Sequence, residues 1–357
     1  MIEQLLSRGR RGFAELRRYS DNLSLVKVTE EGKENDWAEL EVLDISAFNN
    51  TREKEKLASQ LNAAIQTYGF LYIVNPGLET AQVSQQFALA QAIFSLPLEE
   101  KNKYIDHESI PTLGYKPSGE RAMSSGMTDH VEIYDDPKYN SFFREYPRPG
   151  PCIAQQAQTE TFCRYLHSHV LYRLLVLTAI ALDLKDEEAL WKIHNFDAQS
   201  DCHLRYMIHH PRTAQEAEIL RKETDDSDII HRHRDFGTYT LLFSQPVAGL
   251  QVWVEKMGKW QWIKPLPGSI IVNVGECLEM LTNSFFKAPL HRVVVPPEDQ
   301  RQLARLSTIY FTRPDEDTPV HVLDSPLISK ASEEESKFRT IGDWQRNVEW
   351  VIGYSYS

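Results

Sequence analysis

The spacing of apolar and polar residues divides the chain into a largely helical first half and a strand-rich second half. In residues 52–69 the apolar side chains of Leu57, Leu61 and Ile65 recur at every fourth position, which predicts an amphipathic helix that ends at Gly69. The same reasoning predicts a short strand at 40–46, a buried strand at 70–74, mostly helix over 79–104, a proline-rich stretch of loops over 105–160, and a long helix over about 160–184.

The second half contains short apolar runs, several of them alternating with polar residues, as is typical of strands. Turn signals at 257–259 and 265–268 separate some of them, and the first predicts a hairpin. Many short strands after a helical half predict a mixed α/β protein whose core is a jelly roll, or double-stranded β-helix, flanked by helices of the N-terminal half. The eight predicted strands are 203–210, 229–235, 239–243, 250–254, 260–264, 269–274, 291–295 and 303–311.

The net charge indicates which class of partner to expect, and the cysteine content indicates the location in the cell. The formal net charge is −12 and no basic stripe with interleaved aromatic residues is present, so we expect no nucleic-acid partner. The four cysteines include no CxxC pair, which favours a reducing, cytoplasmic location. The most apolar stretch, 171–184, is too short to span a bilayer and predicts a buried helix. The basic segment at 1–18 predicts a surface helix, with a mitochondrial transit peptide as the alternative.

The candidate chemistry lies in HRHRDFGTYTLLF, residues 231–243. His231, His233 and Asp235 occupy alternating positions, and alternate side chains of a strand point to the same face. Iron(II) in non-haem oxygenases takes two histidines and one carboxylate on one face. Spacing alone would also allow a pair of His231 and His233, but only His233 has an aspartate two residues later. A third ligand must come from elsewhere in the fold.

This stretch resembles the signature of a known family, the 2-oxoglutarate and iron(II)-dependent dioxygenases of the isopenicillin-N-synthase-like type. HRDFGTYTLLF is similar to that family's His-x-Asp-[Phe/Tyr]-Gly-x-x-Thr-Leu-Leu signature. The segments GLQV, NVG, FKAPLHRV and ARLSTIYF follow in the family's order, and weaker similarity at 68–77, 94–104 and 340–344 extends the resemblance over about 40–345.

The resemblance implies a set of site residues. His291, which follows His233 by 58 residues (291 − 233), is implied as the third iron ligand beside His233 and Asp235. Arg305 and Ser307 are implied to hold the distal carboxylate of 2-oxoglutarate. The chemistry suits this role, because a guanidinium binds a carboxylate through two parallel hydrogen bonds and a hydroxyl two residues along the strand adds a donor.

The sequence departs from the family at four places. Pro76 replaces a usual histidine, His231 stands where small residues are usual, and the loop 211–233 is long. IHHP at 208–211 replaces a frequent Asn-Tyr-Tyr-Pro, so that His210 stands in place of a tyrosine that contacts the cosubstrate. We interpret His210 either as a contact to 2-oxoglutarate or substrate, or as a packing residue. For His231 we favour a place beside the iron ligands or in the pocket wall, with a merely structural residue or a further ligand as the alternatives.

Three further residues carry weaker expectations. Tyr115 lies in a loop that the family uses near the substrate, and an ordinary buried aromatic is the alternative. Asn273 and Phe236 are interpreted as structural support.

The implied protein is an oxygenase with Fe(II), 2-oxoglutarate as cosubstrate, O2, and ascorbate as a candidate reductant. It would oxidise a small organic metabolite, often of specialised metabolism, and release succinate and CO2. Hydroxylation is the default outcome, with desaturation, ring closure or ring expansion as variants. We expect no membrane and no obligate protein partner. The expected divisions are an N-terminal extension (1–39), an N-terminal dioxygenase region (40–160), the jelly-roll domain with its supporting helix (161–315) and a C-terminal helical tail (316–357).

Two alternatives belong to other functional classes. One is an Fe(II) oxidase of the same fold that does not use 2-oxoglutarate and grips the substrate carboxylate with Arg305 and Ser307. The other is a non-enzymatic binding or scaffold protein, although such a protein would be expected to have lost a ligand and this sequence has all three.

Overall fold

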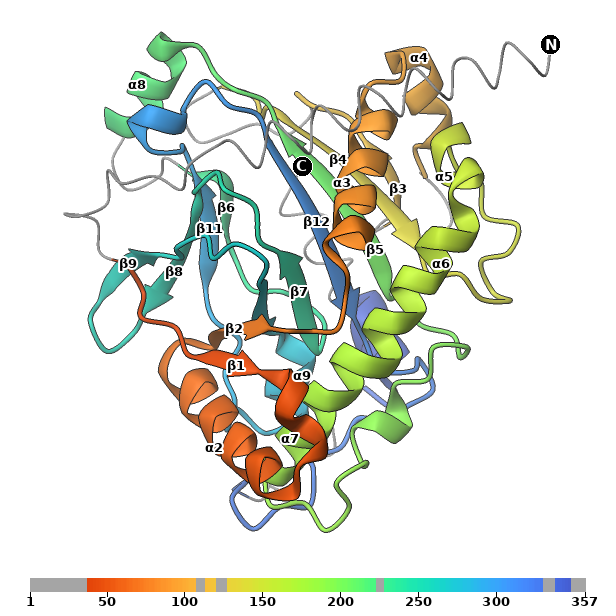
Figure 1. Ribbon diagram of the computed structural model, residues 1–357, viewed down its shortest axis with the longest axis vertical. Helices are drawn as coiled ribbons and strands as arrows, with labels where there is room; N and C mark the ends of the chain where they lie inside the picture. Colours follow the sequence, from red (N-terminus) through yellow and green to blue (C-terminus); the bar gives the residue numbers. More distant parts are fainter. Residues whose placement is uncertain (1–36, 107–112, 120–126, 223–227, 330–337, 348–357) are drawn as a thin grey trace.

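A large sheet with helices on one side and a smaller sheet on the other forms the body of the protein (Figure 1). The computed structural model describes residues 37–106, 113–119, 127–222, 228–329 and 338–347, so the predicted surface helix at 1–18 lies outside it. One hydrophobic core lies between the helices and the large sheet, and a second lies between the two sheets. Two packed sheets with covering helices are the jelly-roll architecture that the strand pattern predicts.

The N-terminal elements form where the sequence places them. Helix α2 (Thr51–Tyr68) begins after Asn50, whose side chain accepts hydrogen bonds from two backbone N–H groups of the first turn. It ends at Gly69, where a positive φ of 68° suits a residue without a Cβ atom. Strand β2 (Phe70–Val74) follows at once and is almost fully buried. The predicted helix and strand are confirmed, while the strand predicted at 40–46 shortens to β1 (Val42–Asp44).

Most of the remaining helices cover the outer face of the large sheet, while α8 lies apart from them on the side of the smaller sheet (Figure 1). The long helix predicted over 160–184 is one run of helical turns, in which a π-helical segment at Leu166–Leu171 joins two α-helices. Its buried side chains pack into the core beside α2. The helices are α3 (Thr80–Phe94), α4 (Leu98–Lys101), α5 (Gly150–Ala154), α6 (Gln156–Tyr165), α7 (Tyr172–Ala181), α8 (Ala214–Lys222) and α9 (Glu276–Leu281).

All eight strands predicted in the second half are present. The large sheet has the order β1-β2-β10-β7-β12-β5-β4-β3, and the small sheet has the order β6-β11-β8-β9. The hairpin predicted at 257–259 joins β8 to β9, with Gly258 at a positive φ of 60°. The strands are β5 (His203–His209), β6 (Asp228–His233), β7 (Tyr239–Phe243), β8 (Leu250–Val254), β9 (Lys259–Trp262), β10 (Ile270–Val274), β11 (His291–Val294) and β12 (Arg305–Thr312).

The expectation of a loop-rich stretch over 105–160 was wrong in one respect. It contains β3 (Gly114–Lys116) and β4 (Val131–Pro137), and β4 is buried along its whole length beside β5. The sequence VEIYDDP did not indicate a strand, because three of its seven residues are acidic and such a composition is typical of surface loops. In the fold each carboxylate has a cationic partner, which makes burial tolerable. The pairs are Glu132 with Lys101, Asp135 with Arg205 and Asp136 with Arg148.

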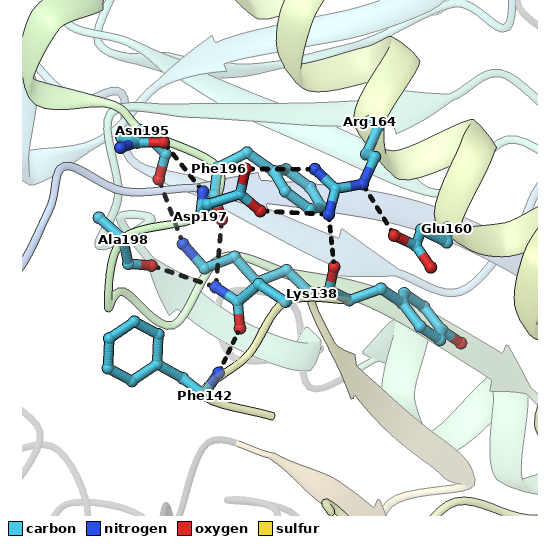
Figure 2. A network of polar contacts seen from close by, with 10 residues as sticks. Lys138, Phe142, Glu160, Arg164, Asn195, Phe196, Asp197 and Ala198 are labelled. Atoms are coloured by element: carbon cyan, nitrogen blue, oxygen red, sulfur yellow. Dashed lines mark hydrogen bonds and ion pairs between the residues drawn. The ribbon is translucent and has the colours of Figure 1, made fainter. Parts of the chain in front are cut away.

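A polar network secures the end of β4 against the loop that leads into β5 (Figure 2). Arg164 of α6 donates to Asp197 at 3.1 Å and to Glu160 at 2.8 Å. Asn140, just after β4, donates its side-chain N–H groups to two carbonyl oxygens of the same loop. Lys138 is buried and donates to Ser200 at 2.7 Å. These contacts hold the entry to β5, whose inner face belongs to the candidate site.

Asp315 next to this loop gives a testable pH dependence. Burial raises the pKa of its carboxyl group to about 6, although it accepts a hydrogen bond from the Asn195 backbone N–H. A raised carboxyl pKa contributes stability at low pH that is lost as the pH rises from about 4 to about 6. Asp315→Asn should therefore raise the free energy of unfolding at pH 7.5 by about 1–2 kcal/mol and leave it nearly unchanged at pH 4. Chemical denaturation at both pH values measures this. An equal effect at both values, or one that the exposed variant Asp324→Asn reproduces, would refute it.

Candidate active site

The three residues predicted as metal ligands meet at one point between the sheets. His233 ends β6 and His291 begins β11, and the two residues face each other across this antiparallel pair. Asp235 lies in the bend after β6, so the strand predicted at 229–235 ends two residues early. The Nε2 atoms of His233 and His291 lie 3.5 and 3.6 Å from Asp235 Oδ1. One ligand atom from each of the three residues lies within 4.8 Å of the others.

The carboxylate of Asp235 is oriented by two donors. Its Oδ2 accepts hydrogen bonds from Thr240 Oγ1 at 2.6 Å and from Asn273 Nδ2 at 2.8 Å, which leaves Oδ1 toward the histidines. Burial acts to raise the pKa of Asp235, but the neighbouring His291 and His233 hold it well below its usual range. The side chain is therefore an anion at neutral pH. Asn273, which was expected to be a structural support, supports the site through this hydrogen bond to Asp235.

The tautomer of His291 is set by the backbone. With the Nδ1–H donating to the Pro289 carbonyl oxygen at 3.1 Å, Nε2 carries the lone pair that faces Asp235. Burial acts to lower the pKa of His291, but the Asp235 carboxylate raises it overall. The edge of the Phe70 ring packs against the imidazole, with ring centroids 5.5 Å apart.

Two imidazole nitrogens and one carboxylate oxygen on one side of a point fit the donor set that non-haem iron(II) prefers. A divalent cation there would neutralise Asp235 and separate the two facing imidazoles, whose ring centroids are 4.3 Å apart. About 29% of the His233 side-chain surface is exposed, so the metal position can be reached from solvent. The arrangement can therefore hold a metal and leave coordination positions for other ligands.

Two glycines hold the Asp235 bend against the sheet. A Cβ atom at Gly275 would lie 2.0 Å from the Gly237 carbonyl oxygen, and one at Gly237 would lie 2.3 Å from the Thr312 carbonyl oxygen. The Glu276 backbone N–H, next to Gly275, donates to the carbonyl oxygen of Asp235 at 2.7 Å. The bend thus lies between β10 and β12 with no space for side chains.

Gly275→Ala is accordingly expected to displace the bend that carries Asp235. We expect the free energy of unfolding to fall by about 1–3 kcal/mol, as for other insertions into packed interiors, together with weaker iron binding. Denaturant unfolding and iron(II) titration measure the two effects. Gly150→Ala is the matched control, because a Cβ atom there meets nothing within 4 Å. Wild-type stability and iron affinity in Gly275→Ala would contradict this account.

Arg305 and Ser307 lie on one face of β12, as predicted, and that face points between the sheets. Arg305 is buried, its Nε donates to the Val247 carbonyl oxygen at 3.3 Å, and no carboxylate among the described residues pairs with it. Burial lowers the pKa of its guanidinium to about 10. The Ser307 hydroxyl is also buried and has no hydrogen-bond partner within the described part of the chain. Both groups are thus available to an anionic ligand.

The two histidines at the end of β5 differ in position. His209 lies directly opposite Arg305 in the β5–β12 pair and shares its face. His210 lines the same cavity as Arg305, but its Nε2 pairs with Glu132 Oε1 at 2.8 Å. The sequence pointed to His210 through its alignment with a family tyrosine. To select His209 as well, one would have needed the register between β5 and β12, which the structure gives and the sequence does not.

The other singled-out residues have clear positions. Tyr115 is buried in β3 and donates to Glu132 Oε2, so it takes part in the same network as His210. Phe236 stacks on Trp344 of the C-terminal helical segment 341–347, with centroids 4.5 Å apart. His231 lies within β6, but its side chain lies outside the described structure.

The jelly roll and its two-histidine, one-carboxylate site define a non-haem iron oxygenase. Comparison with known families agrees. Residues 40–149 match the family described as non-haem dioxygenase in morphine synthesis N-terminal, and residues 202–314 match the 2OG-Fe(II) oxygenase superfamily. The chain belongs to the 2-oxoglutarate and iron(II)-dependent oxygenases of the isopenicillin-N-synthase-like type.

Similar proteins span nearly the whole chain. The 2-oxoglutarate-dependent dioxygenase frbH of Dothideomycetidae sp. is 28% identical over 85% of this chain and 90% of its own. The proline hydroxylase buaE of Petromyces alliaceus is 29% identical over 87% of this chain and 97% of its own. A full-length Neurospora crassa protein solved with alpha-KG and thymine has the same fold, with a TM-score of 0.73, 21% identity, and coverage of 88% of this chain and 97% of that one.

The protein is therefore an oxidoreductase, a dioxygenase that uses Fe(II), 2-oxoglutarate and O2 and acts on small molecules. The comparisons do not favour the oxidase that works without 2-oxoglutarate. Among the described residues, no helix combines the length and apolar character needed to cross a membrane.

Proposed function

We propose that this oxygenase hydroxylates a small organic metabolite, with iron held by His233, Asp235 and His291. The distal carboxylate of 2-oxoglutarate would bind Arg305 and Ser307. The proposal is carried by one observation: the three converging donor residues lie on the same side of the sheet as a buried guanidinium with which no carboxylate of the described residues pairs. Hydroxylation is chosen over desaturation and rearrangement because it breaks only one C–H bond of the substrate, and because the similar buaE is named a proline hydroxylase.

The bound iron and cosubstrate would supply oxygen activation coupled to the decarboxylation of 2-oxoglutarate to succinate and CO2. In the overall balance, 2-oxoglutarate, O2 and a C–H bond of the substrate become succinate, CO2 and a C–OH bond. The protein's part is positioning. Thr240 and Asn273 hold Asp235 with one oxygen toward the metal position, and the Pro289 carbonyl holds His291 in the ligating tautomer.

Arg305 and Ser307 would bind the distal carboxylate of 2-oxoglutarate through charge and hydrogen bonds. A carboxylate at Arg305 would find a guanidinium that is already buried and that pairs with no carboxylate of the described residues, so binding requires little further desolvation of the protein. The Ser307 hydroxyl would gain its missing partner in the same step. His209 lies across from Arg305 and closes this end of the cavity; His210 stays a predicted contact through its position at the same cavity.

The test is an anaerobic visible spectrum of the full chain with Fe(II), before and after 2-oxoglutarate is added. A weak charge-transfer band on addition is expected, because the cosubstrate then chelates the iron. Bound iron without the band would favour the oxidase that grips a substrate carboxylate with Arg305 and Ser307. Failure to bind iron would refute the ligand assignment and would revive the scaffold alternative.

A further inference from the structure

The inner face of the large sheet also carries a charged cluster formed by Arg205 of β5, Asp135 of β4 and Lys116 of β3. Arg205 holds the carboxylate with two hydrogen bonds, from Nε to Oδ1 at 2.6 Å and from Nη2 to Oδ2 at 2.9 Å. Lys116 Nζ lies 2.6 Å from the same Oδ2. Asp135 is fully buried, so the guanidinium is held in one orientation.

The cluster lies beside the candidate iron site. Arg205 is directly opposite Ile309 in the β5–β12 pair, which places it on the same face as Arg305 and Ser307. Its guanidinium lies 4.8 Å from the centre of the Phe311 ring. Phe311 in turn is directly opposite Thr240 of β7, which donates to Asp235. Two strand spacings, about 10 Å, separate β5 from β7.

The carboxylate of the cluster is an anion. Burial alone would raise the pKa of Asp135, but Arg205 and Lys116 hold it well below its usual range. His203 lies 3.6 Å from Asp135, and burial lowers its pKa to about 4, so it adds no charge at neutral pH.

The guanidinium also keeps free donors. Nη1 of Arg205 donates to none of the described residues, and 23% of the side-chain surface is exposed, as is 30% of Lys116. A buried ion pair usually gains little stability over apolar packing, so a charged group on an inner wall is a candidate for binding.

We propose that the substrate is a small carboxylic acid whose carboxylate binds Arg205 and whose oxidised carbon lies within about 10 Å of that anchor. This inference rests on the proposed function and adds the substrate class to it. Asp135 positions the guanidinium, and the Phe311 ring supports its flat face, so that Nη1 and the remaining Nη2 hydrogen point toward the substrate space. Arg305 is left for 2-oxoglutarate, so the two carboxylates have separate partners.

The test uses the full chain loaded anaerobically with Fe(II) and saturating 2-oxoglutarate. It is titrated with a panel of aliphatic, amino and aromatic carboxylic acids, each matched with its primary amide. Binding is measured from the change in the charge-transfer band, and succinate release in air is measured for the same compounds. We expect at least one acid to bind and to stimulate succinate release, with its amide about 10-fold to 100-fold weaker. Arg205→Gln should lose this preference, and Arg205→Lys should keep part of it.

Arg164→Gln is the matched control, because Arg164 also pairs with an aspartate but lies in the network of Figure 2, away from the inner face. It should behave as the wild type. The KM for 2-oxoglutarate should stay unchanged in Arg205→Gln, which separates this site from Arg305. Amides that bind as well as their acids, a panel without any acid that binds, or an unchanged preference in Arg205→Gln would overturn the proposal. A missing charge-transfer band in the wild type would instead overturn the proposed function.

Discussion

Asp235→Ala is expected to weaken iron(II) binding by more than about 100-fold and to abolish measurable succinate release. Changes outside the ligand set typically cost 10-fold to 100-fold in metal affinity, and this change removes a ligand itself. It also removes the one negative charge among the three donors, so that two imidazoles alone would face the cation. Equilibrium dialysis with iron(II) and succinate release with 2-oxoglutarate in air measure the two effects.

Two further variants distinguish the loss of an iron ligand from the loss of a residue that only orients the ligand. Asn273→Ala keeps all three ligands but removes one of the two donors to Asp235 Oδ2, so we expect iron binding to weaken by about 10-fold. Asp315→Asn removes a carboxylate elsewhere in the fold and should leave iron binding unchanged. The melting temperature of each metal-free variant shows whether the fold persists. Wild-type iron affinity in a folded Asp235→Ala protein would refute the role of Asp235 as a ligand.

The convergence of the three proposed iron ligands could be anticipated in part from the sequence, because some of the information is local. His233 and Asp235 lie two residues apart on one predicted strand. His291 was implied only by the family resemblance, and its position opposite His233 is a pairing that the structure shows and the hydrophobic pattern does not give. Periodicity also predicts the α2–β2 unit, where a buried stripe, a capping residue and a glycine stop agree.

The substrate side of the site could not be predicted in the same way. Asp135 and Arg205 are 70 residues apart, and their pairing depends on the register of β4 against β5. The acidic residues of β4 also prevented the prediction of the strand itself. A buried carboxylate is tolerable only with cationic partners, and the sequence does not show which residues those partners are. The distinction between His209 and His210 has the same origin, since a shift of one residue moves a side chain to the other face of a sheet.

Arg305→Gln is expected to raise the KM for 2-oxoglutarate by about 30-fold or more, with a smaller fall in kcat. The guanidinium is buried without an anionic partner among the described residues, and such a charge gains most from a ligand carboxylate that forms two parallel hydrogen bonds with it. Truncation of a buried charged partner costs about 2–5 kcal/mol, which corresponds to a factor of about 30 or more. Ser307→Ala should raise the same KM by about 10-fold, because it removes a single neutral donor.

Arg305→Lys tests whether the cosubstrate is held by the two parallel hydrogen bonds of a guanidinium or by positive charge alone. A lysine ammonium cannot form the two parallel hydrogen bonds, and burial that lowers the pKa of Arg305 to about 10 would lower that of a lysine further below its ordinary value. The lysine variant should therefore recover only part of the loss at neutral pH. Arg301→Gln is the matched control, because Arg301 lines the same cavity but precedes β12, and it should change the KM by less than about 3-fold. Full rescue by lysine, or an equal loss in Arg301→Gln, would show that general positive charge rather than the Arg305 fork holds the cosubstrate.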